Sequence, residues 1–217
     1  MQSANETVPP HPLRGKRTPV ITTTLSAVAI ALVFVSTFSF QLPIPATGGY
    51  FNFGDIAIFI FALTFGPVIG GISGSIGSAL SDLFGGFGNF APFTFMIKGL
   101  EGLLAGLISH RRLGSRNLVA WTARSVLGWI VGSVAMVGGY FLAESYFIAL
   151  VFGSSDLTGI AAASVEFPFN ILQVVAGGIV GIPISLTLRY ALTRTPYYHS
   201  IIGTVVTRRR NPSEPKA

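Results

Sequence analysis

The stretch DIAIFIFALTFGPVIGGISGSIGSALSD, residues 55–82, decides the fold, because it is almost wholly apolar and too long for one membrane span. A helix needs about 20 apolar residues to cross the hydrocarbon core of a bilayer. The FGPVIGG segment in its middle contains Gly66 and Pro67, which favour a turn. We therefore predict two helices joined by a tight turn, with Asp55 and Asp82 on the same side of a membrane.

The composition of the whole chain also favours a membrane protein. Of its 217 residues, 50% are hydrophobic and 10% are charged, whereas about 25% are charged in soluble domains. Residues 20–40 are apolar over a longer run than the roughly 7–15 residues of a signal sequence, so a retained span is expected. The expected fold is an all-α integral membrane protein, a six-transmembrane-helix bundle with helices at about 20–42, 54–66, 68–84, 92–110, 117–143 and 166–190.

The basic residues indicate which side of the membrane is cytoplasmic. With six spans, every Lys and Arg except Lys98 falls on one side, which the positive-inside rule assigns to the cytoplasm. These residues are Arg14, Lys16, Arg17, Arg111, Arg112, Arg116, Arg124, Arg189, Arg194, Arg208, Arg209, Arg210 and Lys216. The N- and C-termini are then both cytoplasmic, in a multi-pass cell-membrane protein of a bacterium or archaeon. We expect a disordered basic tail at 1–19, a six-helix membrane domain at 20–190 and a basic cytoplasmic tail at 191–217.

Residues 143–165 allow two interpretations. The segment AESYFIALVFG either prolongs the fifth helix or lies along the outer surface as an amphipathic helix.

Small residues recur four apart on most of the predicted helices. In the helix at 68–84, Gly70, Gly74 and Ser78 share one face, which predicts close helix contacts and a central position for this helix. In the first helix, Thr23, Ala27 and Ala31 form a similar stripe. This stripe either packs inside the bundle or receives another protein, and composition does not choose between the two.

Ionisable residues within the predicted spans indicate a functional site, because they are costly at membrane depth. Lys98 and Glu101 lie in the segment FTFMIKGLEGLLAGL, three residues apart, so they share a helix face and can pair. At 1.5 Å per residue from Pro92, they lie about 9 Å and about 13 Å deep, in the outer half of the membrane.

The other polar residues expected near this level complete a candidate substrate pocket. Its predicted members are Asn52, Asp55, Asp82, Asn89, Lys98, Glu101, Glu166, Asn170 and Gln173. Phe-rich loops at the same level favour a small polar-aromatic ligand. The alternative interpretation is structural, with Lys98 and Glu101 as an internal ion pair and Asp82 as a helix end group.

Missing motifs exclude several other functions. The chain has no cysteine, no G-x-x-x-x-G-K-[ST] phosphate loop, no H-E-x-x-H and no G-x-S-x-G. We place its three histidines, His11, His110 and His199, in the tails or in a cytoplasmic loop. An enzyme is therefore not expected, nor a cofactor, nor a metal site. Nucleic acid is not an expected partner, because no folded basic domain accompanies the basic tails.

Two segments carry a resemblance to a known family. These are NFGDIAIFIFALTFGPVIGGISGSIGSALSDLFGGFGNFAPFTFMIKGLEGLLAGL, residues 52–107, and EFPFNILQVVAGGIVGIP, residues 166–183. In these segments the chain resembles the substrate-binding S component of energy-coupling factor (ECF) transporters, of the riboflavin-type group. The resemblance covers about residues 20–190.

The resemblance implies a protein that captures a vitamin or related heterocycle outside the cell. A transmembrane coupling protein and two ATPase subunits would supply the energy, and the S component would topple in the bilayer to release its cargo inward. In the family, small residues on the first helix dock on the coupling protein, which assigns that role here to Ala27 and Ala31, with Thr23 in the same stripe. The loop after the first helix would be the gate, with Pro43, Pro45, Gly48, Gly49 and Tyr50.

The resemblance leaves the substrate open among riboflavin, pyridoxine-like, pyrimidine and other heterocyclic compounds. Lys98 either meets an anionic or carbonyl group of the substrate or is part of the scaffold together with Glu101. In the second case Asn52, Asn89, Asn170 and Gln173 select the ligand. Two alternative functions are a self-sufficient proton-coupled transporter that uses Glu101 or Asp82, and an intramembrane scaffold without cargo.

Overall fold

The computed structural model describes residues 19–45, 48–110, 118–151 and 156–195. Six helices account for most of them: α1 (Pro19–Phe38), α2 (Gly54–Phe65), α3 (Pro67–Gly85), α4 (Ala91–His110), α5 (Leu118–Val151) and α6 (Asp156–Thr193). Two short antiparallel strands, β1 (Leu42–Ile44) and β2 (Gly49–Phe51), form a hairpin between α1 and α2. The tails at 1–18 and 196–217, and with them most of the predicted basic residues, lie outside the described residues.

The hairpin was not predicted, although the described residues are mostly helical as expected. Its register pairs Pro43 with Tyr50 and Ile44 with Gly49. Gly48, at its turn, has a φ of 72°, a left-handed conformation that glycine adopts without steric cost. Strands of three residues are too short to show the alternating pattern by which a strand is recognised in a sequence.

The predicted break inside residues 55–82 is confirmed. Gly66 separates α2 from α3 with a φ of 95°, and Pro67 begins α3, where its missing N–H costs nothing. The segment after residue 143 continues α5 to Val151, so it prolongs the fifth helix. The sixth helix begins at Asp156, ten residues before the predicted start, because the alanine-rich segment 160–163 favours a helix.

Four of the described helices are long and apolar enough to cross a membrane, namely α1, α4, α5 and α6. Helix α2 is equally apolar but has 12 residues, a length of about 18 Å, which is less than the roughly 30 Å of a bilayer core.

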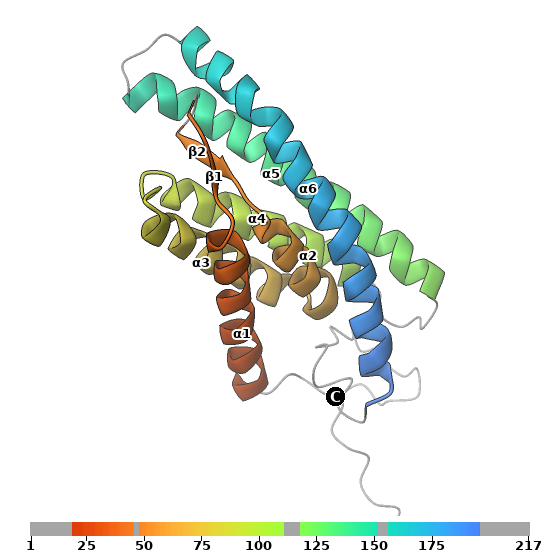
Figure 1. Cartoon of the computed structure of the whole chain (residues 1–217). Helices are drawn as coiled ribbons and strands as arrows, with labels where there is room; N and C mark the ends of the chain where they lie inside the picture. The colour runs from red at the N-terminus through yellow and green to blue at the C-terminus, as the bar shows by residue number, and fades with distance from the viewer. Residues whose placement is uncertain (1–18, 46–47, 111–117, 152–155, 196–217) are drawn as a thin grey trace, which may run out of the picture.

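Helix α2, rather than α3, occupies the centre of the bundle. It contacts all five other helices, whereas α3 contacts α1, α2 and α4 (Figure 1). Nine of the 12 residues of α2 are buried, and they include Ile58, Phe59 and Leu63. The prediction that residues 68–84 are central is therefore wrong. Helix α3 keeps one apolar face exposed, with Val68, Ile72, Ile76 and Leu83.

Small residues bring α3 and α4 into direct backbone contact, as predicted. A methyl group added at Gly74 would lie 2.3 Å from the carbonyl oxygen of Lys98, and one added at Gly102 would lie 2.2 Å from that of Gly70. These distances leave room for hydrogen alone, which allows the close packing by which helices associate in lipid.

Helix α1 packs on α2 and α3 through one face. Its buried residues are Ser26, Ala29, Val33 and Thr37. The stripe of Thr23, Ala27 and Ala31 is exposed on the other side of the helix.

The bundle has two chemically different ends. The hairpin end carries β1 and β2, and the start of α1 and the end of α6 lie together at the opposite end (Figure 1). We call that end the arginine end, because Arg189 is buried there. Nη2 of Arg189 lies 3.2 Å from Nδ1 of His110, and its guanidinium lies over the ring of Trp121. Nε2 of His110 lies 3.2 Å from the carbonyl oxygen of Thr64. His110 is thus the last residue of α4 and packs against other elements, which corrects its placement in a loop.

Candidate functional site

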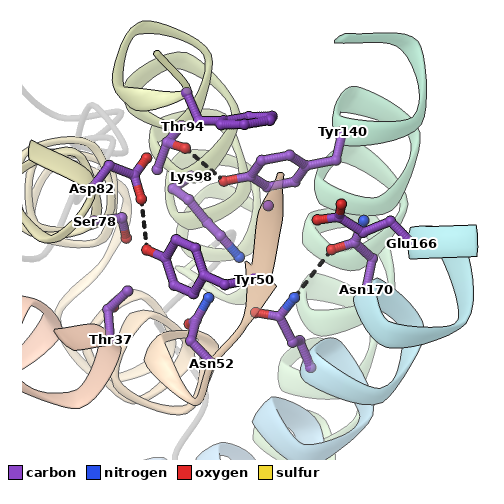
Figure 2. A pocket seen from close by; sticks show the side chains of 13 residues that line it. Thr37, Tyr50, Asn52, Ser78, Asp82, Thr94, Lys98, Tyr140, Glu166 and Asn170 are labelled. Atoms are coloured by element: carbon purple, nitrogen blue, oxygen red, sulfur yellow. Dashed lines mark hydrogen bonds between the residues drawn. The ribbon is translucent and has the colours of Figure 1, made fainter. Parts of the chain in front are cut away.

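A polar cavity lies at the hairpin end, among α1, β2, α3, α4, α5 and α6 (Figure 2). About 370 Å³ of space free of protein atoms lies among its lining residues, part of it open to the surroundings, and little of that space is wide enough for more than a water molecule. Its lining residues are Thr37, Gly49, Tyr50, Asn52, Ser78, Asp82, Phe90, Thr94, Lys98, Tyr140, Glu166, Asn170 and Gln173. A ring-sized ligand therefore needs part of this wall to move.

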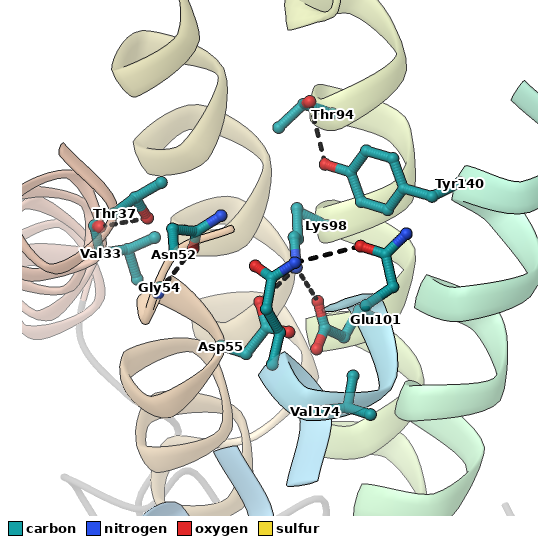
Figure 3. Close-up of polar contacts among 12 residues, drawn as sticks. Val33, Thr37, Asn52, Gly54, Asp55, Thr94, Lys98, Glu101, Tyr140 and Val174 are labelled. Atoms are coloured by element: carbon teal, nitrogen blue, oxygen red, sulfur yellow. Dashed lines mark hydrogen bonds and ion pairs between the residues drawn. The ribbon is translucent and has the colours of Figure 1, made fainter. Parts of the chain in front are cut away.

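The floor of the cavity is an ion-pair cluster around Lys98 (Figure 3). The Lys98 ammonium contacts Oδ1 of Asp55 on α2 and lies 3.4 Å from Oε2 of Glu101. It also lies 5.5 Å from the centre of the Tyr140 ring on α5. All three charged side chains are buried. The ion pairs join α2 to α4, the contact with Tyr140 adds α5, and the single ammonium group serves two carboxyl groups.

The predicted pairing of Lys98 with Glu101 is confirmed. The contact with Asp55 was not predicted as a pair, because the two residues lie 43 positions apart in the chain.

The hairpin is fastened over the cavity by Tyr50. Its hydroxyl donates a hydrogen bond of 2.6 Å to Oδ1 of Asp82 at the end of α3, and its ring packs 4.3 Å from that of Phe87. Burial of the phenol, followed by the negative charge of Asp82, raises the pKa of Tyr50 well above its usual value. The phenol therefore stays protonated and keeps donating to Asp82 while the hairpin is closed.

Amide side chains form another part of the wall. Asn52 accepts a hydrogen bond of 2.8 Å from the backbone N–H of Gly54 and so shapes the start of α2. On α6, Nε2 of Gln173 donates to Oδ1 of Asn170 at 3.0 Å. The backbone of the hairpin also reaches α6, since a methyl group added at Gly49 would lie 2.6 Å from Oε1 of Glu166.

The structure brings most of the sequence-predicted residues to this cavity. Those that line it are Asn52, Asp82, Lys98, Glu166, Asn170 and Gln173, together with Gly49 and Tyr50 of the predicted gate. Asp55 and Glu101 lie beside the floor, in contact with Lys98 but not on the cavity surface. Asn89 is exposed in the turn between α3 and α4 and does not line the cavity.

Four polar lining residues were missed by sequence reasoning: Thr37, Ser78, Thr94 and Tyr140. A helical spacing points to two of them, since Ser78 precedes Asp82 by four residues and Thr94 precedes Lys98 by four. The hydroxyl of Tyr140 donates to that of Thr94 at 3.0 Å. Thr37 offers no such signal, because its helix carries no predicted site residue near it.

A second hollow has a different character. It lies along α3, α4 and α5, is lined mainly by exposed apolar side chains such as Ile72, Met96 and Leu103, and lacks charged groups. A surface of this kind suits lipid, whereas the polar cavity has the converging hydrogen-bonding groups of a ligand site.

The chain resembles proteins of one transporter family. The model of the family described as ECF-type riboflavin transporter, S component, matches residues 18–190. An uncharacterized protein from a gap 3′ region of Pyrococcus woesei is 41% identical over 69% of this chain and 88% of its own length.

Two relatives with assigned activities match at lower identity. The thiamine precursor transporter HmpT of Lactococcus lactis is 31% identical over 72% of this chain and 81% of its own. The riboflavin transporter RibU of Staphylococcus aureus is 26% identical over 72% of this chain and 82% of its own.

A solved structure supports the fold. The S component of a bacterial ECF transporter superposes with a TM-score of 0.54 at 22% identity, over 81% of this chain and 96% of the other. The apolar helices fit the multi-pass membrane location that this family shares. The chain belongs to the family of ECF-type riboflavin transporter S components.

Proposed function

We propose that the protein is the membrane-embedded substrate-binding subunit of an ATP-driven importer. It captures a vitamin or related heterocycle in the polar cavity and delivers it inward together with a transmembrane coupling protein and two ATPase subunits. The observation that carries the proposal is a buried polar cavity closed by a hairpin at one end of an apolar bundle. Relatives named for thiamine-precursor and riboflavin transport support the same class of cargo.

The proposal includes a topology of six spans. Length and composition identify α1, α4, α5 and α6 as candidate spans, and α2 and α3 would be the other two. The hairpin end faces outward, and the arginine end faces the cytoplasm with both termini. The described arginines, Arg124, Arg189 and Arg194, lie near the ends of α5 and α6 that belong to the arginine end, in agreement with the positive-inside rule.

Binding requires the hairpin to open, because the closed cavity is too narrow for a ring. Two contacts that join the hairpin to the helices can be broken and remade, namely the Tyr50–Asp82 hydrogen bond and the close approach of Gly49 to Glu166. Residues 46–47, between the two strands, lie outside the described part of the chain.

The direct test is mass spectrometry of small molecules released from freshly purified, denatured protein. We expect a stoichiometric vitamin-like heterocycle, and its absence after growth with such compounds would contradict a binding role. Reconstitution into liposomes separates the two transport mechanisms. Uptake by this chain alone under a proton gradient would favour a self-sufficient transporter, whereas we expect uptake to require the coupling protein, the ATPases and ATP.

A further inference from the structure

A buried hydroxyl in the cavity wall, that of Ser78, has no hydrogen-bond partner among the described residues. Ser78 is 1% exposed and lines the cavity from α3, one turn before Asp82 (Figure 2). A buried hydroxyl without a partner is destabilising, because folding removes its hydrogen bonds to water and supplies nothing in their place. The presence of this hydroxyl at the cavity therefore needs an explanation other than folding.

Serine in a helix commonly satisfies its hydroxyl by donating to a backbone carbonyl three or four residues earlier. The serines that do so in this bundle are Ser36, Ser73, Ser109, Ser145, Ser164 and Ser185. Ser78 does not make this bond, so its hydroxyl is available to a group inside the cavity.

The small size of Ser78 does not explain its hydroxyl. Gly70 and Gly74 of the same stripe allow close helix packing, since a methyl group added at either would lie within 2.5 Å of α2 or α4. At position 78 an alanine would be as small as serine and would bury no unpaired polar atom. The hydroxyl, rather than the size, therefore distinguishes this position.

Asp82 provides an acceptor next to Ser78. The two residues lie four apart in α3, so their side chains share a helix face. Tyr50 donates to Oδ1 of Asp82, and the Thr94 hydroxyl lies near the same carboxylate, whereas Oδ2 has no donor of normal hydrogen-bond geometry among the described residues. A carboxylate offers about four acceptor positions, so these two neighbours leave room for a donor from a ligand.

A hydroxyl group is the ligand group that satisfies both residues. Its oxygen accepts from the Ser78 hydroxyl, and its hydrogen donates to Oδ2 of Asp82. A carbonyl group accepts but brings no hydrogen for Asp82. An amino group on an aromatic ring donates but accepts poorly, so the Ser78 hydrogen would stay unpaired. The bond from Tyr50 shows that this carboxylate receives a neutral O–H donor in buried surroundings.

We propose that Ser78 is a specificity-determining residue that binds, together with Asp82, a hydroxyl group of the substrate. The cavity then prefers heterocycles that carry a hydroxyl or hydroxymethyl substituent over the same rings without it. The inference rests on the proposed function and specifies its substrate class. The space that remains in the closed cavity admits a group of about the size of a water molecule, and a hydroxyl group has that size.

The first test uses the full-length wild-type protein and pairs of probes that differ in hydroxyl content. The pairs are pyridoxine and deoxypyridoxine, riboflavin and lumiflavin, and an aminopyrimidine with a hydroxymethyl group and the same ring with a methyl group. We expect calorimetry to show at least tenfold tighter binding of the hydroxyl-bearing member of one pair, as for a hydrogen bond to a charged group.

Each other outcome of this test contradicts the inference. Equal or tighter binding of the members without the hydroxyl would overturn it while supporting the proposed function. Binding of no probe would also overturn it, and mass spectrometry of copurified molecules then decides the proposed function by itself.

The second test applies variants to the pair that the wild type discriminates. Ser78→Ala removes one neutral hydrogen bond, so we expect about a two- to tenfold loss of affinity for the hydroxyl-bearing probe and no loss for its counterpart. Ser125→Ala is the matched control, because Ser125 is also fully buried, has no hydrogen-bond partner among the described residues and lies outside the cavity lining. An equal loss for both probes, or no loss for either, would refute the role of Ser78.

The stability of the empty protein separates this role from a structural one. Ser78→Ala removes a buried hydroxyl that has no partner, so we expect an unchanged or higher melting temperature without ligand, as for Ser125→Ala. With the hydroxyl-bearing probe at a fixed concentration, the increase in melting temperature should be smaller in Ser78→Ala than in the wild type. A Ser78→Ala protein that melts well below the wild type without ligand would show that the hydroxyl stabilises the fold and would contradict the proposal.

Discussion

At the scale of single residues, Lys98 is the most constrained side chain of the site. It is the shared partner of two buried carboxylates from two helices. Its pairing with Glu101 could be predicted from a spacing of three residues, because local helix geometry alone sets that distance. Its contact with Asp55 could not, since it depends on how α2 packs against α4.

Replacing Lys98 by Met should destabilise the protein strongly. The variant leaves Asp55 and Glu101 buried without a cation, and breaking a buried ion pair in this way typically costs about 3–5 kcal/mol. The measurement is the melting temperature in detergent, with Met96→Leu as control, because Met96 lies on the same helix and is 72% exposed. Adding Asp55→Asn to Lys98→Met should recover part of the loss, and a Lys98→Met protein as stable as the control would refute this account.

Tyr50 sets how firmly the hairpin closes. Tyr50→Phe removes the donor to Asp82, so we expect the retained ligand to dissociate about 10–150 times faster, as for the loss of one hydrogen bond to a charged group. Because the pKa of Tyr50 is raised in the closed state, closure is fully favoured below the ordinary tyrosine range of about 10 and weakens as pH rises above it. Stopped-flow dissociation across pH measures both effects. Tyr146→Phe, at an exposed position on α5, is the control. Equal ligand dissociation rates in the two variants would show that the Tyr50–Asp82 hydrogen bond does not hold the hairpin closed.

At the scale of helices and strands, the turn-forming residues predicted the helix boundary correctly, whereas segments with weak apolar periodicity were misassigned. Gly66 and Pro67 predicted the α2–α3 turn, because each acts on the backbone locally. The hairpin and the early start of α6 were missed, since three-residue strands and an alanine-rich segment carry no strong apolar periodicity. The central position of α2 also escaped prediction, because burial on all sides depends on contacts with every other helix.

The contact between α3 and α4 should fail when one methyl group is added. Gly74→Ala places a carbon 2.3 Å from the carbonyl oxygen of Lys98, which is backbone and cannot move aside cheaply. We expect a loss of about 1–3 kcal/mol, typical of overpacking, and weaker ligand binding because Lys98 shifts. Gly138→Ala is the matched control, since nothing lies within 4 Å of the added carbon there. Equal melting temperatures for the two variants would show that the helices separate without cost.

At the scale of the whole molecule, we expect ligand binding and partner docking to use different surfaces. The cavity lies at the hairpin end, whereas the stripe of Thr23, Ala27 and Ala31 is exposed along α1. The sequence could predict which residues belong to the stripe from their spacing of four. It could not show that they face away from the bundle, because the buried face of α1, which includes Ala29 and Val33, is equally apolar.

This separation predicts that transport can be lost while binding is kept. Ala27→Trp or Ala31→Trp enlarges a surface where small residues would let the helix of a coupling protein approach closely. Neither change reaches the cavity, whose α1 contribution is Thr37 on the buried face. We therefore expect normal ligand affinity in the purified variants and a loss of at least tenfold in uptake by vesicles that contain the coupling protein and ATPases.

Ile179→Trp on α6, where the side chain is 70% exposed, is the control for adding a bulky ring to the lipid-facing surface. If all three variants transport equally well, the stripe is not the docking surface; if Ala27→Trp loses binding while remaining folded, the two surfaces are coupled and the separation is wrong.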